Sequence, residues 1–502
     1  MTRRVLMAAG LALGLLLGAL DQFVFATALP TMAGELGGLS SLLWVNTAYV
    51  LTGTVAMPVY GVLGDRLGRR TVFVAAMAIF LVGSVIGGLA ASMPVLIAAR
   101  AIQGLGGGGL LILVQAIVAD VIAARERLPY LTAIDAVFAV AAVSGPVLGG
   151  WLTDTVGWRW AFWINLPVGL VAIVAALVLL PISPRSDRRV RFDLAGALVL
   201  AVAVTLLVLI TAWGGSRLPW TSPLLVGLVL AAVVAVVTFV RIELRTADPV
   251  LPLSLLASRN VALAVSAGLL LGVAMFGTVG YLPTYLQLVQ GLSPTRAGLM
   301  MLTLIAGLAV AATVAAQLVR RTGRYKALPV IGAGLVAAAL LGLSSLGQGD
   351  GLPEIGLYLF GLGTGIGCAW EVLVVVVQNS VRPDRVGVAT AANGFFRELG
   401  VLLGTALVGA LFAARLGGLL AARLPGSGIG IDPNSVTPER LRQLPLEIRD
   451  LLAAAYGDAL TPVFALLVPL VLAALVGLCL IRPDPLATRP VGASNQDVSP
   501  EL

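Results

Sequence analysis

The stretch GALDQFVFATALP, residues 18–30, places the carboxylate of Asp21 inside an apolar run that extends from about Val5 to Pro30. At roughly 1.5 Å of rise per residue, a helix of this length crosses a lipid bilayer. A charged group inside a membrane costs a few kcal/mol, so such residues usually face a protein interior or an aqueous cavity and mark an ion or proton pathway. Asp21 is the first functional residue that the sequence predicts.

The composition of the chain shows that this apolar run is one of many. The 502 residues are 59% hydrophobic and only 11% charged, with a mean hydropathy of +1.02. The charged residues form short islands between about fourteen apolar runs, which is typical of membrane helices and not of alternating barrel strands. We expect an all-α polytopic membrane protein.

The basic charge follows the predicted topology. The net charge is +8, and most of the 32 Lys and Arg residues fall in islands on the same side as the N-terminus. This asymmetry satisfies the positive-inside rule and predicts that both termini are cytoplasmic in a multi-pass protein of the cell inner (plasma) membrane. The charge is explained by topology, so we expect no nucleic-acid partner.

Several chemistries lack the residues they need. The chain has no histidine, and its two cysteines, Cys368 and Cys479, lie in predicted spans, so neither a metal site nor a disulfide is expected. No Gly-x-x-x-x-Gly-Lys-Ser/Thr loop and no Gly-x-Ser-x-Gly elbow occur. We expect no enzyme activity and no cofactor, and any proton chemistry must use carboxylates.

A second intramembrane charge lies in the segment RAIQGLGGGG, residues 100–109. Arg100 is about as far from the outer end of its span as Asp21 is from the outer end of the first span. A buried arginine needs a partner, and an acid that responds to it can be a proton switch. A permanent structural ion pair is the alternative.

The island GVLGDRLGRR, residues 61–70, combines glycines with one acid and three arginines. Such residues allow two helix ends to approach closely and can form a charge network that breaks when two halves rock; a plain basic turn is the alternative. The pattern resembles the signature loop of the major facilitator superfamily. The Asp21 stretch resembles the first-span signature of its drug:proton antiporters, and residues 100–106 resemble its fourth-span motif, whose arginine is linked to proton transfer. The resemblance implies coupling by Asp21, Arg100 and Gln103.

The same resemblance extends to residues 144–150, SGPVLGG. Glycine and proline kink a helix and let it pack closely, which an ordinary kinked helix would also do. The pattern resembles the antiporter motif of exporters, with Ala141 where the family often has glycine, and it implies outward transport. Residues implied in gating or conformational change are Gly61, Asp65, Arg66, Gly68, Arg69, Asp120, Asp135, Gly145, Pro146, Gly149 and Gly150.

Residues 158–167, WRWAFWINLP, indicate an aromatic girdle anchored by Arg159. Together with residues 192–196 they resemble the fourteen-span antiporters of the QacA and EmrB group. That group implies the major facilitator fold with 14 transmembrane helices: six-helix bundles at 1–181 and 261–482, and two extra helices within 182–260. Residues 417–457 are expected to form a long outer loop, either a lid or a surface helix, and residues 483–502 a disordered cytoplasmic tail. Residues 317–326 weakly repeat the 61–70 island, with Arg320 where the acid Asp65 would be.

The second half contributes two more intramembrane acids, Glu371 and Glu398. Each is a candidate for binding a substrate cation or a proton, with a buried structural acid as the alternative. Nearby aromatic residues could contact a cation. The predicted substrate-binding residues are Glu371, Trp370, Glu398, Phe395 and Phe396.

These features predict a proton-coupled exporter that expels lipophilic, cationic compounds by alternating access, as in multidrug efflux and antibiotic resistance. Its partners would be a small-molecule substrate, protons and the lipid bilayer, and we expect a monomer. Two alternatives remain. The substrate could be a specific metabolite, antibiotic, siderophore or lipid, or the chain could be a receptor or regulator on a transporter fold.

Overall fold

The computed structural model describes residues 2–36, 42–180, 193–214, 218–347, 351–423 and 446–486. In these ranges the regular structure is helical, apart from one isolated bridge between Gly214 and Leu218. Twelve of the described helices are long and apolar enough to cross a membrane, and the apolar part of α1, Gly10–Phe25, adds a shorter one. The predicted all-α polytopic membrane protein is confirmed at this level.

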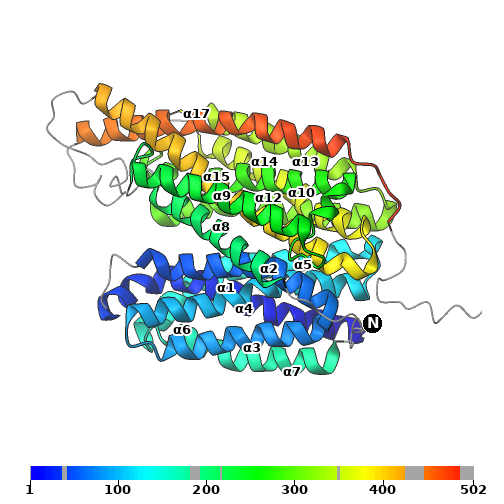
Figure 1. Ribbon diagram of the computed structural model, residues 1–502. Helices are drawn as coiled ribbons and strands as arrows, with labels where there is room; N and C mark the ends of the chain where they lie inside the picture. Colours follow the sequence, from blue (N-terminus) through cyan, green and yellow to red (C-terminus); the bar gives the residue numbers. More distant parts are fainter. Residues whose placement is uncertain are drawn as a thin grey trace, which may run out of the picture.

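Two helical bundles form the molecule, one from each half of the chain (Figure 1). The first contains α1 (Thr2–Leu36), α2 (Leu42–Leu67), α3 (Arg69–Gly88), α4 (Met93–Val121), α5 (Ala124–Thr155), α6 (Trp160–Trp163) and α7 (Asn165–Leu179). The second contains α10 (Arg259–Val279), α11 (Leu282–Leu288), α12 (Pro294–Thr322), α13 (Ala327–Ser344), α14 (Leu352–Asn379), η3 (Pro383–Arg385), α15 (Val386–Arg423) and α17 (Leu446–Cys479).

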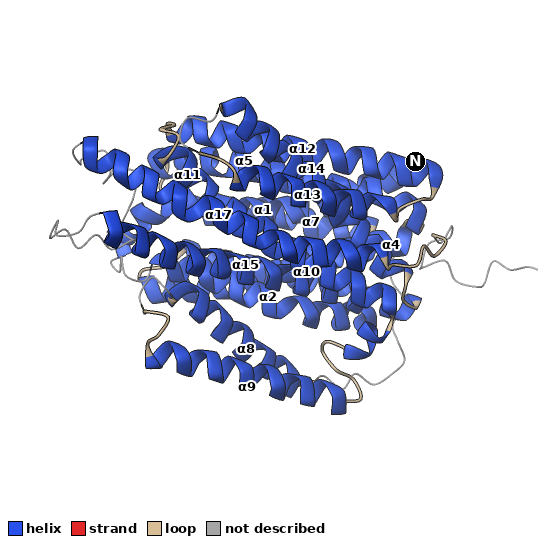
Figure 2. Ribbon diagram, turned by 90° about the horizontal axis from the view of Figure 1, so that it is seen from above, coloured by secondary structure: helices blue, strands red, loops and turns tan. Residues whose placement is uncertain are grey.

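Two further helices connect the bundles. They are α8 (Leu194–Trp213) and α9 (Pro223–Arg245), followed by the short η2 (Leu253–Ala257). Helix α8 contacts both α2 and α15, whereas α9 packs on α8 at the edge of the molecule (Figure 2). Only 17% of the apolar window of α9 is buried, so this helix presents an apolar surface of the kind that lipid covers.

The glycine run of α4 explains how the first bundle packs. A Cβ at Gly108 would overlap the backbone of Gly53 in α2, and one at Gly106 would lie 2.5 Å from the carbonyl oxygen of Ala76 in α3. Residues without side chains therefore let α4 lie directly against both neighbours, as small residues do in membrane bundles. This places Arg100 and Gln103 of α4 inside the bundle.

The predicted outer loop 417–457 is shorter than expected. Helix α15 continues to Arg423, and α17 already begins at Leu446. The loop prediction failed at its ends because small and leucine-rich segments there continue the helical pattern. Residues 424–445 of the predicted loop, and the tail after residue 486, lie outside the described residues.

Candidate functional site

The first candidate site is a buried polar cluster around Asp21 of α1. Asp21 is 1% exposed and Arg100 is fully buried. The Arg100 guanidinium forms an ion pair with Oδ2 of Asp21, and Nη1 of the same arginine donates to Oε1 of Gln103 at 3.0 Å. Gln103 in turn donates from Nε2 to Oδ1 of Asp21 at 3.0 Å. The structure therefore brings together all three residues predicted for proton coupling.

Two members of this cluster were not predicted from the sequence. Asn165, the first residue of α7, donates from Nδ2 to Oδ1 of Asp21 and to Oγ of Ser84, both at 3.0 Å. Gln103 also donates to Ser84 at 2.8 Å. The available signal was a lone amide at the start of the apolar segment NLPVGLVAIVAALVL.

Aromatic rings enclose the arginine. The Arg100 guanidinium carbon lies 4.4 Å from the ring centroid of Phe25 and 4.3 Å from that of Tyr49. A cation–π contact stabilises a desolvated guanidinium by about 2 kcal/mol or more. If Asp21 takes up a proton and loses its negative charge, Arg100 therefore still has favourable neighbours. This arrangement can accept a change in the charge of Asp21 without leaving Arg100 wholly uncompensated.

The expected aromatic girdle at residues 158–167 is wrong for its first residue. Trp158 is 1% exposed and donates from Nε1 to Oε2 of Glu35 at 2.9 Å. Arg159 forms an ion pair with the same carboxylate at 2.9 Å. A partner on α1 thus draws the indole into the protein, which aromatic spacing alone cannot reveal.

The second candidate site is a charge network at one end of the molecule. We call this end the basic face, defined by the 61–70 loop, Arg125, Arg320–Arg324 and Arg382–Arg385. Arg69, 3% exposed, forms ion pairs with Asp65 at 2.8 Å and with Asp120 of α4, and donates to the carbonyl oxygen of Ala116 at 2.7 Å. Gly68 has a φ of 92°, which provides the turn between α2 and α3.

Asp65 also holds the second bundle. Its carboxylate accepts hydrogen bonds from the backbone N–H groups of Gly387 at 2.9 Å and Val388 at 2.8 Å, in the first turn of α15. Carboxylates are favoured at helix N-termini because free N–H groups and the helix dipole point toward them. Gly61 allows α2 to lie this close to α15, because a Cβ at position 61 would overlap the Cβ of Ala391.

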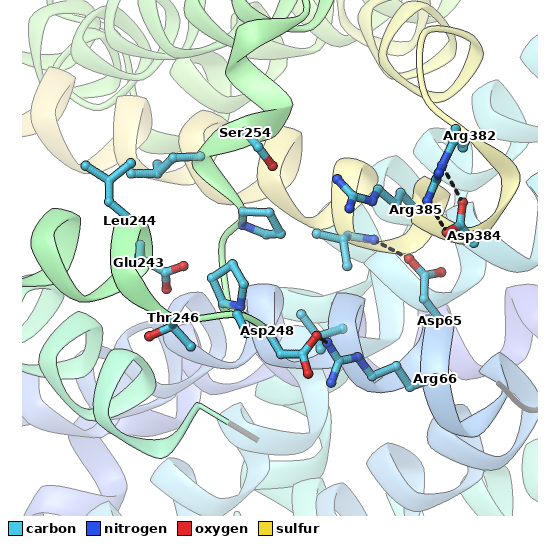
Figure 3. Close-up of a pocket in the computed structure, with 16 residues that line it drawn as sticks. Asp65, Arg66, Glu243, Leu244, Thr246, Asp248, Ser254, Arg382, Asp384 and Arg385 are labelled. Atoms are coloured by element: carbon cyan, nitrogen blue, oxygen red, sulfur yellow. Dashed lines mark hydrogen bonds and ion pairs between the residues drawn. The ribbon is translucent and has the colours of Figure 1, made fainter. Parts of the chain in front are cut away.

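A polar cavity of about 700 Å³ lies beside this network (Figure 3). Arg66 reaches across its edge to Asp248, in the segment after α9, with an ion pair of 2.6 Å. Glu243 at the end of α9 is 3% exposed and accepts from the backbone N–H of Leu251 at 3.2 Å. The ion pair fixes the connecting segment to residues 61–70, and the hydrogen bond fixes it to the end of α9.

Further hydrogen bonds join the two bundles at the basic face. Arg125 donates to the carbonyl oxygens of Arg320 and Arg321, at 3.1 and 2.9 Å. Arg127 donates to Oε1 of Gln378 at 3.2 Å, and Gln378 donates to the carbonyl oxygen of Gln115 at 3.3 Å. The bundles are thus closed against each other at this face. Arg127 and Gln378 were not predicted, although both are polar residues next to apolar spans.

The glycines of the SGPVLGG stretch differ in how closely other helices pack against them. A Cβ at Gly145 would lie 2.5 Å from the Cβ of Phe23, so this glycine permits the close approach of α5 to α1. Gly150 has no neighbour that a Cβ would meet within 4 Å, and Gly149 accepts a hydrogen bond from Thr153 at 2.6 Å. The side chains of Asp135 and Pro146 lie outside the described residues.

The predicted substrate residues of the second bundle lie on α14 and α15. Glu371 is 3% exposed. Trp370 packs edge-on against Phe276, with ring centroids 6.2 Å apart, and Phe395 packs edge-on against Phe396 at 5.6 Å. Glu398 forms no ion pair with Arg397, as expected for neighbours on different sides of a helix.

Two bundles of apolar helices, a buried ion pair between spans and a charge network joining the bundles at one face define a polytopic membrane transporter. The Major Facilitator Superfamily model matches residues 11–405, and the chain belongs to this family.

Known proteins agree with this assignment. The chain is 40% identical to an uncharacterized MFS-type transporter of Mycobacterium tuberculosis, over 96% of this chain and 70% of that protein. It is 32% identical to the multidrug transporter protein MdtP of Bacillus subtilis (84% and 78% covered) and 34% identical to the acurin A biosynthesis cluster MFS-type transporter of Aspergillus aculeatus (82% and 75%). Its fold matches the human organic anion transporter MFSD10, with a TM-score of 0.59 at 18% identity, over 95% of this chain and 100% of the other. The predicted family is confirmed, and a multidrug transporter among the relatives is consistent with its drug:proton antiporter branch.

Proposed function

We propose that this protein is a proton-coupled exporter of lipophilic, preferentially cationic compounds. The observation that carries the proposal is the buried carboxylate of Asp21, held by Arg100, Gln103 and Asn165. An intramembrane acid with a charged partner is a natural proton site. Relatives described as a multidrug transporter and an efflux pump support the direction of transport.

The proposed topology has fourteen spans, with both termini in the cytoplasm and the protein acting as a monomer in the plasma membrane. Helices α1 and α5, of 35 and 32 residues, would add two spans to the twelve candidates. The basic face would then be cytoplasmic, in accord with the positive-inside rule. A chain closed at that face would expose its substrate site to the outside.

Helix α4 offers a physical route from the proton site to the closed face. It carries Arg100 and Gln103 at one level, and Ala116 and Asp120, which bind Arg69, near its other end. A proton on Asp21 would remove its attraction for Arg100, and a small shift of α4 would then disturb Arg69 and Asp65. Alternating access follows when Asp65 releases the start of α15.

Proton movement in inside-out vesicles tests the proposal. Lipophilic cations, neutral drugs and lipids are added to vesicles with a preformed proton gradient, carrying wild type, Asp21→Asn or the control Asp154→Asn, whose side chain is exposed. We expect cations to release protons with wild type and with the control but not with Asp21→Asn. Gradient-driven efflux retained by Asp21→Asn would remove Asp21 from the coupling path.

Export of one endogenous metabolite is the second candidate function. The observation in its favour is the similarity to a transporter named for a biosynthesis cluster. If none of the panel compounds releases protons, this alternative is favoured.

A further inference from the structure

The second bundle carries a groove of about 710 Å³ at the basic face. It lies between the turn that joins α12 to α13 and the segment that follows α17. Ala327, Val330 and Ile331 of α13 form an apolar wall together with Cys479 of α17, and residues 483–485 form another wall. Both helices are candidate membrane spans. The groove therefore lies where two spans reach the basic face.

Two basic side chains stand at the mouth of this groove. Helix α12 ends at Gly323, whose φ of 68° turns the chain toward α13. Within the turn, Tyr325 is 4% exposed and is directed into the protein. Its neighbours Arg324, which is exposed, and Lys326, which is half-buried, both line the groove. The turn thus brings two positive charges to one opening.

These two charges differ from others at the basic face in having no acidic partner. The positive-inside rule explains their sign but not this difference. Arg66, Arg69 and Arg382 each form an ion pair with an aspartate at the same face. Arg324 and Lys326 form no ion pair with any residue that the structure describes. An anion at the mouth of the groove would supply the partner that they lack.

The one acid in the lining, Asp484, is held by another helix. Asn260 of α10 donates from Nδ2 to Oδ2 of Asp484 at 2.7 Å and to the carbonyl oxygen of Arg482 at 3.0 Å. The backbone N–H of Arg482 donates back to Oδ1 of Asn260 at 2.9 Å. These bonds fix the wall formed by residues 483–485 against α10. With two basic residues and one acid, the lining keeps a net positive charge.

The apolar wall identifies the kind of anion that fits. Ile331 is 55% exposed, and Ala327 and Cys479 are also exposed. Ile331 follows Lys326 by five residues, so it lies roughly 7.5 Å further along α13, toward the middle of the span. A free phosphate would contact the mouth and leave this wall bare. A phospholipid satisfies both parts, because its phosphate and its acyl chain are separated in the same direction.

We propose that this groove binds an anionic phospholipid, with the phosphate held by Arg324 and Lys326 and one acyl chain lying along Val330 and Ile331. The bound lipid would join the turn between α12 and α13 to the segment after α17. The site is separate from the Asp21 cluster, and the inference depends neither on the direction of transport nor on proton coupling.

Photo-crosslinking of the full chain in nanodiscs tests this inference. Phosphatidylglycerol and phosphatidylcholine with the same photoactivatable acyl chain are compared as dilute probes, and labelled peptides are located by mass spectrometry. A basic residue near an anionic lipid strengthens its binding by about fivefold. We expect phosphatidylglycerol to label residues 327–331 and 479–485 at least about fivefold more than phosphatidylcholine. Arg324→Gln and Lys326→Gln should each reduce this labelling about fivefold, and Lys326→Arg should keep it.

A matched control separates this site from general attraction to a basic surface. Arg245→Gln removes an exposed arginine at the end of α9, a helix that also presents an apolar surface, and should leave labelling of the groove unchanged. Soluble glycerol phosphate at millimolar concentration should not displace the lipid. Equal labelling by the two lipids, no labelling of the groove, an equal loss with Arg245→Gln, or displacement by glycerol phosphate would overturn the inference.

Discussion

At the scale of single residues, Asn165 carries the sharpest prediction because it belongs to the Asp21 cluster, whereas the sequence placed it only in the aromatic stretch 158–167 and gave it no role of its own. Its amide donates to both Asp21 and Ser84 at 3.0 Å. Asn165→Leu removes one of two donors from each of two buried acceptors, Oδ1 of Asp21 and Oγ of Ser84, and leaves both to Gln103 alone, which costs about 1–3 kcal/mol. We expect a lower thermal unfolding midpoint and proton-coupled efflux reduced by about tenfold. Leu170→Ala, at an exposed position of the same helix, should change neither, and wild-type efflux by Asn165→Leu would limit the cluster to Asp21, Arg100 and Gln103.

A second residue-scale prediction concerns Glu35. Hydrogen bonds from Trp158 and then from Arg159 lower the pKa of Glu35 below its ordinary value. A carboxyl whose pKa is lower in the folded state stabilises the fold above its unfolded pKa, and this contribution is lost as the pH falls through the folded pKa. Wild type should therefore unfold at a higher temperature than Glu35→Gln near neutral pH. The difference should shrink as the pH falls past the ordinary pKa of a glutamate and disappear once the pH is below the lowered pKa of the folded state. A difference that persisted in stronger acid would mean that charge on Glu35 is not its source.

At the scale of elements, Asp65 accepts hydrogen bonds from the first turn of α15. Loss of this contact should favour opening of the basic face. A Cβ at Gly387 would overlap the Asp65 carboxylate. Gly387→Ala should push that carboxylate away from the N–H groups of α15 and cost about 1–2 kcal/mol of this closed state, since charge-assisted hydrogen bonds to a helix start have about this strength. The open population should rise by about five- to thirtyfold.

Cysteine labelling measures this change. Ala391→Cys, facing Gly61, is introduced into a background without Cys368 and Cys479, and its reaction with a soluble maleimide is followed. Gly387→Ala should speed the reaction, while Gly298→Ala, a glycine with open space around it, should not. Unchanged labelling with Gly387→Ala would show that the contact between Asp65 and α15 does not hold the face closed.

The two helices between the bundles show what element-level prediction can and cannot give. Their apolar lengths predict α8 and α9 as membrane helices, because hydropathy depends on composition alone. The ion pair of Arg66 with Asp248 joins residues 182 positions apart, and no local pattern encodes it. Such contacts depend on how helices are rotated and docked, and docking is a property of the whole fold.

At the scale of the whole molecule, the same distinction explains which site residues were predictable. Asp21 and Arg100 are detectable because a charge within an apolar span demands a partner at the same depth. Asn165, Arg127 and Gln378 are ordinary polar residues near span ends, and only packing of separate helices gives them a role. The family resemblance identified the remaining site residues, such as those of the 61–70 loop. In that loop Asp65 contacts Gly387 of α15, which is 322 positions further along the chain.

The closed basic face leads to a prediction about the transport cycle. Arg125 binds the carbonyl oxygens of Arg320 and Arg321, so cysteines at 125 and 320 should be joined by a short reducible bis-thiosulfonate reagent in a background without Cys368 and Cys479. Alternating access requires these bundles to separate at this face, so cross-linking should stop efflux and reduction should restore it. The single variants Arg125→Cys and Arg320→Cys, treated in the same way, should keep transporting. If the cross-linked protein still transports, substrate must cross without separation of the bundles at the basic face, and the contacts of Asp65, Arg125 and Arg127 would be fixed structure instead of a gate.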